Sequence, residues 1–203
     1  MKFEKVLEEI FGKKSSISIL RVLSEKGIGL TGRQTAELSG LNHRTCQLAL
    51  KKLHTEGIVT LKRVGKANLY TLKKDHVLVK NSILPLFEIE KNLLNKVLSE
   101  ITKELRANVL SLILFGSHAR MKGSADSDLD ICVVVSSQKG KTIVDKKSEI
   151  LSQKVMQLCG NNLSLYVKSD KEIKRKYLEE NPLIKEIVSE GKVFYGKKLE
   201  EIL

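Results

Sequence analysis

The chain has few aromatic residues and lacks any long hydrophobic run. Aromatic side chains make up 4% of its 203 residues, and Trp is absent. The core must therefore be aliphatic, and stacking of nucleic-acid bases on aromatic side chains is disfavoured. No apolar stretch has the length of a membrane span, and the first residues do not have the pattern of a signal peptide. These absences predict a cytoplasmic globular protein without a membrane partner.

Cysteine is also scarce. Cys46, Cys132 and Cys159 are odd in number, far apart in the sequence and flanked by apolar residues. A disulfide framework or a zinc site needs cysteines in pairs or close clusters. The three cysteines are therefore expected to be buried free thiols in a reducing compartment.

Acidic residues are outnumbered by basic ones. The chain contains 36 Lys and Arg against 24 Asp and Glu, which gives a formal net charge of +12. Residues 1–75 hold 15 basic and 7 acidic residues, whereas residues 76–203 hold 21 and 17. Because a positive surface attracts polyanions, the N-terminal third is expected to be the end that binds one.

The N-terminal third has the pattern of short helices followed by a β-hairpin. Helices are predicted over residues 15–25, 31–40 and 42–56, and strands over residues 58–62 and 68–72. Thr31 and Gln34 have the spacing of a capping box, and Asn42 is a good cap for the next helix. Two helices joined by a Gly-containing turn form a helix-turn-helix, whose second helix suits the DNA major groove.

This pattern, with a basic turn Arg63-Val64-Gly65-Lys66 in the hairpin, resembles the winged-helix DNA-binding domains of prokaryotic transcription regulators. The resemblance covers about residues 13–75 and implies double-stranded DNA as a partner and transcription regulation as a role. The residues expected to contact DNA are His43, Arg44, Gln47, Lys51, Arg63 and Lys66. The alternative is a winged helix that contacts protein and whose charges are solvated. The net charge favours DNA, since phosphate neutralisation dominates affinity.

Residues 76–107 have a helical pattern. Leu94, Val97, Leu98, Ile101 and Leu105 recur at three- and four-residue spacing. A proline at position 85 predicts a break or bend near the start. The expected organisation is a winged-helix domain over residues 1–75, a helical linker over 76–107 and a second domain over 108–203. The apolar stripe can pack on the second domain or against another copy of the chain, as in a homodimer.

The second domain is organised around residues 110–135. Apolar runs at 110–115 and 131–135 predict two buried strands, and a short helix is expected from Ser117 to Met121. Gly116 allows a tight turn after the first strand, and the helix N-terminus with the Ser117 hydroxyl suits an anion.

A pair of carboxylates enters the second of these strands. Asp128 and Asp130 are separated by one residue, so their side chains point to the same face. Like charges on one face favour a cation between them, and Mg²⁺ accepts such ligands together with water and phosphate oxygens. The alternative is a solvated turn.

The motif Gly116-Ser117-x-Ala119-Arg120 followed by Ser127-Asp128-x-Asp130 resembles the signature of the DNA polymerase beta-like nucleotidyltransferase superfamily. Its minimal nucleotidyltransferase branch is the most similar. Together with the winged-helix resemblance and the helical linker, this resemblance implies an α+β fold: a winged helix, a linker helix and a mixed sheet with helices. It also implies catalytic and metal-binding roles for Asp128 and Asp130, nucleotide binding by Gly116, Ser117 and Arg120, and Mg²⁺ with a nucleoside triphosphate as ligand or substrate.

Two residues depart from the pattern of this family. Met121 stands where the family usually has Gly. Ser164, on a strand predicted over residues 163–167, stands where the family has a third catalytic carboxylate. Serine cannot carry the charge that fixes a second metal or activates a hydroxyl. Other carboxylates lie at Asp126, Asp145, Glu149 and Asp170, and none has the right position by pattern.

The remaining pattern predicts further elements of the second domain. They are a polar loop over 136–141, a helix over 142–158, helices over 171–180 and 183–189, and an edge strand over 193–195. His118 lies inside the motif and is a candidate for lining the nucleotide pocket.

Three functions fit these features. The first is a DNA-binding transcription regulator whose nucleotidyltransferase-like domain binds a magnesium-nucleoside triphosphate with weak or lost transfer. The second is an active nucleotidyltransferase that moves a nucleoside monophosphate to a hydroxyl of a protein or small molecule. The third is an antitoxin-like partner of a helical toxin encoded nearby.

Overall fold

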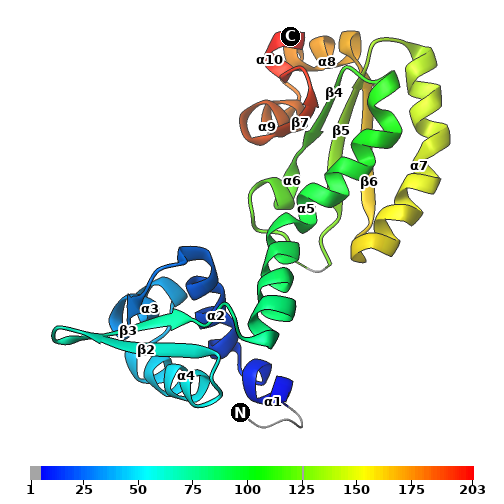
Figure 1. Cartoon of the computed structure of the whole chain (residues 1–203). Helices are drawn as coiled ribbons and strands as arrows, with labels where there is room; N and C mark the ends of the chain where they lie inside the picture. The colour runs from blue at the N-terminus through cyan, green and yellow to red at the C-terminus, as the bar shows by residue number, and fades with distance from the viewer. Residues whose placement is uncertain (1–5, 125) are drawn as a thin grey trace. The chain divides into compact units, whose positions relative to one another are not determined.

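The computed structural model of the chain describes residues 6–124 and 126–203. It divides into two compact units, Met1–Asn92 and Leu93–Leu203, with the boundary inside helix α5 (Leu84–Leu105) (Figure 1). The expected domains 1–75 and 108–203 each lie within one unit, and the expected linker 76–107 is divided between them. No helix in the described part of the chain is long and apolar enough to cross a membrane.

The first unit has a winged-helix fold. Its elements are α1 (Val6–Phe11), α2 (Lys14–Lys26), β1 (Leu30–Thr31), α3 (Gly32–Ser39), α4 (His43–Thr55), β2 (Val59–Val64) and β3 (Ala67–Leu72). The three strands form an antiparallel sheet in the order β1-β3-β2. The capping box of Thr31 and Gln34 is present, and Asn42 caps α4 by accepting from the Thr45 N–H. These caps confirm the helix starts that were predicted from the sequence.

The hairpin of this unit is longer than predicted. Pairing of β2 with β3 extends to Val64 and Ala67, so Arg63 and Val64 belong to a strand and not to the turn. Only Gly65 and Lys66 form the loop, and Gly65 has a φ of 60°. A glycine with positive φ at the first position of a two-residue loop is typical of the hairpin turn that matches the strand twist.

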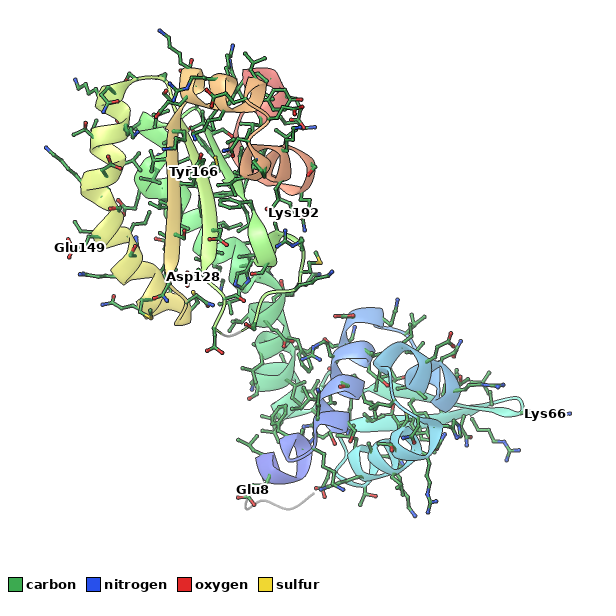
Figure 2. All side chains as sticks on the ribbon, turned by 180° about the vertical axis from the view of Figure 1, so that it is seen from behind. Glu8, Lys66, Asp128, Glu149, Tyr166 and Lys192 are labelled. Carbon is green, nitrogen blue, oxygen red and sulfur yellow. The ribbon has the colours of Figure 1, made fainter. Side chains whose placement is uncertain are left out.

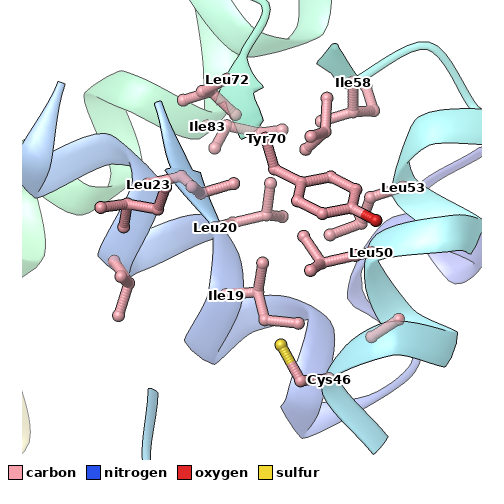
Figure 3. Packing of buried hydrophobic residues seen from close by; sticks show 14 of the residues in the cluster. Ile19, Leu20, Leu23, Cys46, Leu50, Leu53, Ile58, Tyr70, Leu72 and Ile83 are labelled. Atoms are coloured by element: carbon pink, nitrogen blue, oxygen red, sulfur yellow. The ribbon is translucent and has the colours of Figure 1, made fainter. Parts of the chain in front are cut away.

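The core of the first unit is aliphatic, as predicted. Figure 3 shows Leu20 from α2, Leu50 and Leu53 from α4, and Leu72 from β3 packed against one another. All four are at most 3% exposed. The thiol of Cys46 is buried in the same cluster and is free. Each apolar carbon removed from water contributes to stability, so these side chains fix α2 and α4 under the sheet.

The helical segment after the β2–β3 hairpin is not uniform. A π-helical turn, η1 (Val79–Ile83), precedes α5, and a 3-10 turn, η2 (Arg106–Asn108), follows it. Pro85 is the second residue of α5, directly after the π-helical turn. Because proline lacks an N–H and its ring crowds the preceding turn, the change of helix type here accounts for the predicted break.

The second unit contains a mixed four-stranded sheet. Its other elements are β4 (Ser111–Leu114), α6 (Gly116–Ala119), β5 (Leu129–Val135), α7 (Gln138–Cys159), β6 (Leu163–Ser169), α8 (Asp170–Leu178), α9 (Pro182–Glu190), β7 (Lys192–Gly196) and α10 (Leu199–Ile202). The strand order is β6-β5-β4-β7, with β5 and β6 parallel and the other pairs antiparallel. The mixed sheet and the edge position of β7 are confirmed.

Two of the predicted boundaries in this unit are wrong. The loop predicted over residues 136–141 ends at Ser137, because the Ser137 hydroxyl accepts from the Gly140 N–H and α7 begins at Gln138. The short helix predicted over 117–121 is α6, which covers Gly116 to Ala119. Of the other cysteines, Cys132 is buried as predicted and Cys159 is only half-buried.

The two faces of the sheet are covered by different helices. The C-terminal half of α5 and α7 pack on the face that contains Leu129 and Ile131, and α8, α9 and α10 pack on the face that contains Cys132 and Val134. Side chains alternate along a strand, so Asp130 shares its face with Cys132. The carboxylate pair therefore belongs to the face of α8 and α9.

Candidate functional site

The predicted site residues gather at one end of the four-stranded sheet. β4 ends at Leu114, which pairs with Ile131 near the start of β5, and β5 starts beside Leu163 at the start of β6. The helix α6 follows β4 at this end, and Figure 2 shows Asp128 there. The chain thus brings the Gly-Ser motif, the two aspartates and the first residues of β6 together.

Gly116 lies directly against the carboxylate of Asp130. Its φ is 70°, and a Cβ added to it would stand 2.5 Å from Oδ2 of Asp130. A side chain at this position would therefore need the left-handed region and would also displace the carboxylate. Only glycine allows the N-terminus of α6 to approach Asp130 this closely, so the expected phosphate-binding turn and the expected metal ligand are adjacent.

The carboxylate of Asp130 is in an environment that disfavours its charge. Burial raises the pKa of Asp130, and the nearby charge of Asp128 raises it further. A hydrogen bond with Ser164 and the proximity of His118 act in the opposite direction. A bound cation would stabilise the carboxylate of Asp130, which is partly buried beside the like charge of Asp128.

The donor set fits a single Mg²⁺ ion. Asp128 and Asp130 are two oxygen donors on one face, and no group of three His, Cys, Asp or Glu able to hold a metal occurs within 6–124 and 126–203. Magnesium keeps several waters and is bound in proteins by one or two carboxylates plus substrate phosphates. The two aspartates beside the N-terminus of α6 match this mode and not a cage made entirely of protein ligands.

Ser164 lies opposite Asp130. The register of the parallel pair β5 and β6 places the two residues side by side, on the face that the aspartates share. Two of the other candidate carboxylates lie elsewhere: Glu149 points outward from α7 (Figure 2), and Asp170 follows Ser169 at the far end of β6. A neutral hydroxyl therefore faces the aspartate pair.

Arg120 is paired with two glutamates of α9. Its guanidinium donates to Glu186 and Glu190 of α9 at 2.6 and 2.9 Å, and these carboxylates raise its pKa. The sequence did not indicate these two partners. The structure thus brings together Gly116, Ser117, Asp128 and Asp130 from the predicted set, and it pairs Arg120 with α9.

Three residues that the sequence did not single out as a group contact the loop before β5. The amide of Asn162 donates to Asp128 Oδ1 at 3.2 Å, and the amide of Asn161 donates to the Ser127 carbonyl at 3.0 Å. Nε2 of His118 lies 3.2 Å from the same carbonyl. His118 also lines a cavity of about 150 Å³ with Leu129, Cys159 and Asn161. The only sequence signal for the asparagines was their place before the third strand.

The predicted DNA-binding residues lie on α4 and on the hairpin. His43, Arg44 and Lys51 are exposed on α4, and Arg63 and Lys66 are exposed on the hairpin, with Lys66 at its tip (Figure 2). Gln47 differs from them because it is half-buried. The hydroxyl of Tyr70 donates to Gln47 Oε1 at 3.5 Å, and Gln47 Nε2 lies 3.4 Å from Nε2 of His43. Five exposed side chains, four of them from Lys or Arg, thus lie on α4 and on the β2–β3 hairpin.

Comparisons with solved structures gave several partial likenesses. The AntR antimony-specific transcriptional repressor is 20% identical, with a TM-score of 0.37, over 46% of this chain and 78% of its own. Spectinomycin adenyltransferase AAD(9) from Enterococcus faecialis is 23% identical, with a TM-score of 0.40, over 56% and 59%. A mutant of the toxin-antitoxin MntA-HpeT is 19% identical, with a TM-score of 0.34, over 51% and 78%. All three TM-scores are below 0.5, so nothing about activity is taken from them.

The family comparison covers the second unit and the end of α5. The comparison with curated proteins gave no match. The family model described as Polymerase beta, Nucleotidyltransferase matches residues 95–200, just over half of the chain. This range includes the Gly-Ser motif, the aspartate pair and the whole mixed sheet. The chain belongs to the polymerase beta nucleotidyltransferase family and joins a domain of that family to a winged-helix domain.

Proposed function

We propose that the protein is a DNA-binding transcription regulator whose nucleotidyltransferase domain binds a magnesium-nucleoside triphosphate and transfers nucleotide slowly or not at all. The observation that carries this proposal is the position of Ser164 opposite Asp130. A hydroxyl at this place leaves the aspartate pair as ligands and removes the third carboxylate.

Different residues at the end of the sheet would bind the phosphates and the metal of the triphosphate complex. Free N–H groups at the start of α6 and the Ser117 hydroxyl would hold phosphate oxygens, because Gly116 keeps this turn open and close to Asp130. Asp128 and Asp130 would hold the metal. Bound Mg²⁺ supplies positive charge that neutralises the phosphates.

Transfer needs more than this binding. An attacking hydroxyl must lose its proton, and loss of a general base typically costs about a hundred- to ten-thousandfold in rate. Ser164 cannot accept that proton at neutral pH. Burial raises the pKa of Asp130, and the hydrogen bond with Ser164 only partly offsets this, so a bound cation would help to keep the carboxylate ionised. The geometry therefore favours retention of the ligand over transfer.

Calorimetry of Mg·ATP binding to the full chain tests the nucleotide site. Asp130→Asn removes one charged metal ligand and is expected to weaken Mg²⁺-dependent binding about tenfold or more. The matched control is Asp145→Asn, since Asp145 is exposed on α7, which covers the other face of the sheet. Equal affinity of Asp130→Asn and the wild type would exclude the aspartates as ligands.

A transfer assay separates the regulator from the alternative, an active nucleotidyltransferase. Pyrophosphate release and labelling of acceptors by α-labelled triphosphate are measured for the wild type and Ser164→Asp. We expect little transfer by the wild type and more by Ser164→Asp, which restores a carboxylate opposite Asp130. Rapid transfer by the wild type that Asp128→Asn abolishes would establish the active enzyme and show that another residue serves as base.

The DNA-binding part of the proposal rests on the exposed charges of α4 and the hairpin. Arg63 and Lys66 are remote from the helix that would read bases, so they are expected to contact phosphates. Changing both to Ala should weaken binding to every duplex and reduce the slope of affinity against salt by about two. Fluorescence anisotropy across a salt series measures this, and Gln47→Ala is compared for sequence preference. If the affinity depends neither on the salt concentration nor on these substitutions, DNA is excluded as the partner.

A further inference from the structure

We infer that Asn162, Asn161 and His118 are positioning residues that hold Asp128 in the orientation for binding a divalent cation before any ligand arrives. This inference rests on the proposed nucleotide site. It assigns a role to three side chains that supply no negative charge to the metal. It also explains how a loop carries a metal ligand without the support of a third carboxylate.

Asn162 contacts Asp128 through its side chain and the next residue, Leu129, through its backbone. Its carbonyl accepts from the Leu129 N–H at 2.8 Å, and its amide donates to Asp128 Oδ1 at 3.2 Å. Asp128 itself precedes the first residue of β5, so the strand does not orient its side chain. A donor on Oδ1 restricts rotation of the carboxylate and leaves Oδ2 for another partner. Restricting the side chain beforehand removes an entropic cost from cation binding.

The backbone carbonyl of Ser127, the residue before Asp128, is held by two further side chains. It lies within hydrogen-bond distance of Asn161 Nδ2 at 3.0 Å and of His118 Nε2 at 3.2 Å. A carbonyl oxygen has two lone pairs, so both groups donate when His118 carries its proton on Nε2. His118 belongs to α6, whereas Asn161 follows α7. The residue before Asp128 is thus joined to the expected phosphate-binding helix on one side and to the start of β6 on the other.

The loop between α6 and β5 is shaped to allow these contacts. A Cβ added at Gly123 would stand 2.5 Å from Cε1 of His118, so the glycine lets the loop pack on the imidazole. The Ser127 hydroxyl accepts from the Ser124 N–H at 2.9 Å, so Ser127 is tied to the segment that follows α6. The carbonyl and the hydroxyl of Ser127 are therefore both engaged. Residues that orient metal ligands in this way typically change metal affinity about 10- to 100-fold when mutated.

The test measures binding of Mn²⁺ alone and of Mg·ATP to the full chain. Variants Asn162→Ala, Asn161→Ala and His118→Ala are compared with the control Asn95→Ala, which alters an exposed residue of α5. We expect the first variant to weaken Mn²⁺ binding about tenfold and the control to bind as the wild type does. His118→Gln can place an amide donor near the position of Nε2 and should restore affinity lost in His118→Ala. Urea midpoints are measured for every variant.

Hydrogen exchange without ligand gives an independent readout. The Ser127 N–H donates to the Ser124 carbonyl and the Leu129 N–H to Asn162, so both amides report on the order of this loop. Faster exchange at 126–130 in Asn162→Ala, with an unchanged urea midpoint, supports the inference even if the wild type binds no cation. In that case the proposed nucleotide site fails by itself. The positioning role would be overturned if all three variants kept the cation affinity and the exchange rates of the wild type. It would also be overturned if a variant lowered the urea midpoint but kept wild-type affinity.

Discussion

At the residue scale, Met121 shows why the family usually has glycine at this place. Met121 has a φ of 57°, in the left-handed region, and its side chain is 87% exposed. Its backbone strain therefore lowers the stability of the fold, and no burial of its side chain compensates. Such a conformation costs about 1 kcal/mol or more for a residue other than glycine. Glycine would avoid this strain, but its greater conformational freedom in the unfolded chain would offset part of the stabilisation.

We therefore expect Met121→Gly to raise the free energy of unfolding of the second unit by about 0.5–1 kcal/mol. Met121→Ala is the matched control, since it removes the exposed side chain and keeps the positive φ. Urea denaturation measures both. Equal stability of the two variants would mean that the backbone at Met121 is not strained.

The site was predictable where it depends on local spacing. The alternation of a strand predicted a shared face for Asp128 and Asp130, although β5 begins only at Leu129, and the pairing of β5 with β6 places Ser164 beside Asp130. The asparagines could not be found in this way. Their contacts depend on the end of α7 and on the loop before β5, and no residue pattern encodes a side-chain amide meeting a carbonyl 34 residues earlier.

At the element scale, the sequence located most helices and strands of both units, but it missed the short elements β1 and α10 and several ends. The start of α7 was predicted late because Gly140 and Lys141 have the composition of a loop, whereas the Ser137 cap determines the actual start. The hairpin was predicted short because Arg63 and Val64 were assigned to a turn, although pairing with Asn68 and Ala67 continues the ladder. In both cases hydrogen bonding to a neighbouring residue outweighed composition.

The link between α2 and the start of α5 allows a test of pH dependence. Arg21 donates through two nitrogens to Glu90, both at 2.8 Å, and lies over the Phe87 ring at 5.5 Å. The hydrogen bond from Arg21 lowers the pKa of Glu90. A lowered folded-state pKa gives stability that is present above the unfolded value of about 4.3 and disappears as pH falls through the folded value. Solvent screens the pair, so its contribution is about 0.5 kcal/mol.

Glu90→Gln is accordingly expected to destabilise the first unit by about 0.5 kcal/mol at pH 7 and to have no effect near pH 3. Urea denaturation at the two pH values measures the difference. Glu37→Gln, at an exposed residue of α3, serves as the control. A loss of stability that is the same at both pH values would show that Glu90 contributes by packing and not by charge.

At the scale of the whole molecule, the two units have separate hydrophobic cores. The core of the first unit contains fully buried residues up to Ile83, and those of the second begin at Val97. Between them α5 contains exposed apolar side chains, among them Ile89 and Leu93. The sequence predicted a linker helix here from its periodicity, and periodicity alone cannot show which part of a helix belongs to which core.

Because the cores are separate, a cavity in one is expected to leave the other intact. Leu50 and Leu112 are both fully buried, the first in the core of the winged helix and the second in that of the sheet. Leu50→Ala should cost about 2–5 kcal/mol and accelerate hydrogen exchange in α2, α3 and α4 while β4 and β5 keep their protection. Leu112→Ala should have the reverse effect, which makes each variant the control for the other. Accelerated exchange in both units from either change would show that they unfold as one cooperative body, and stability could then not be assigned to each unit separately.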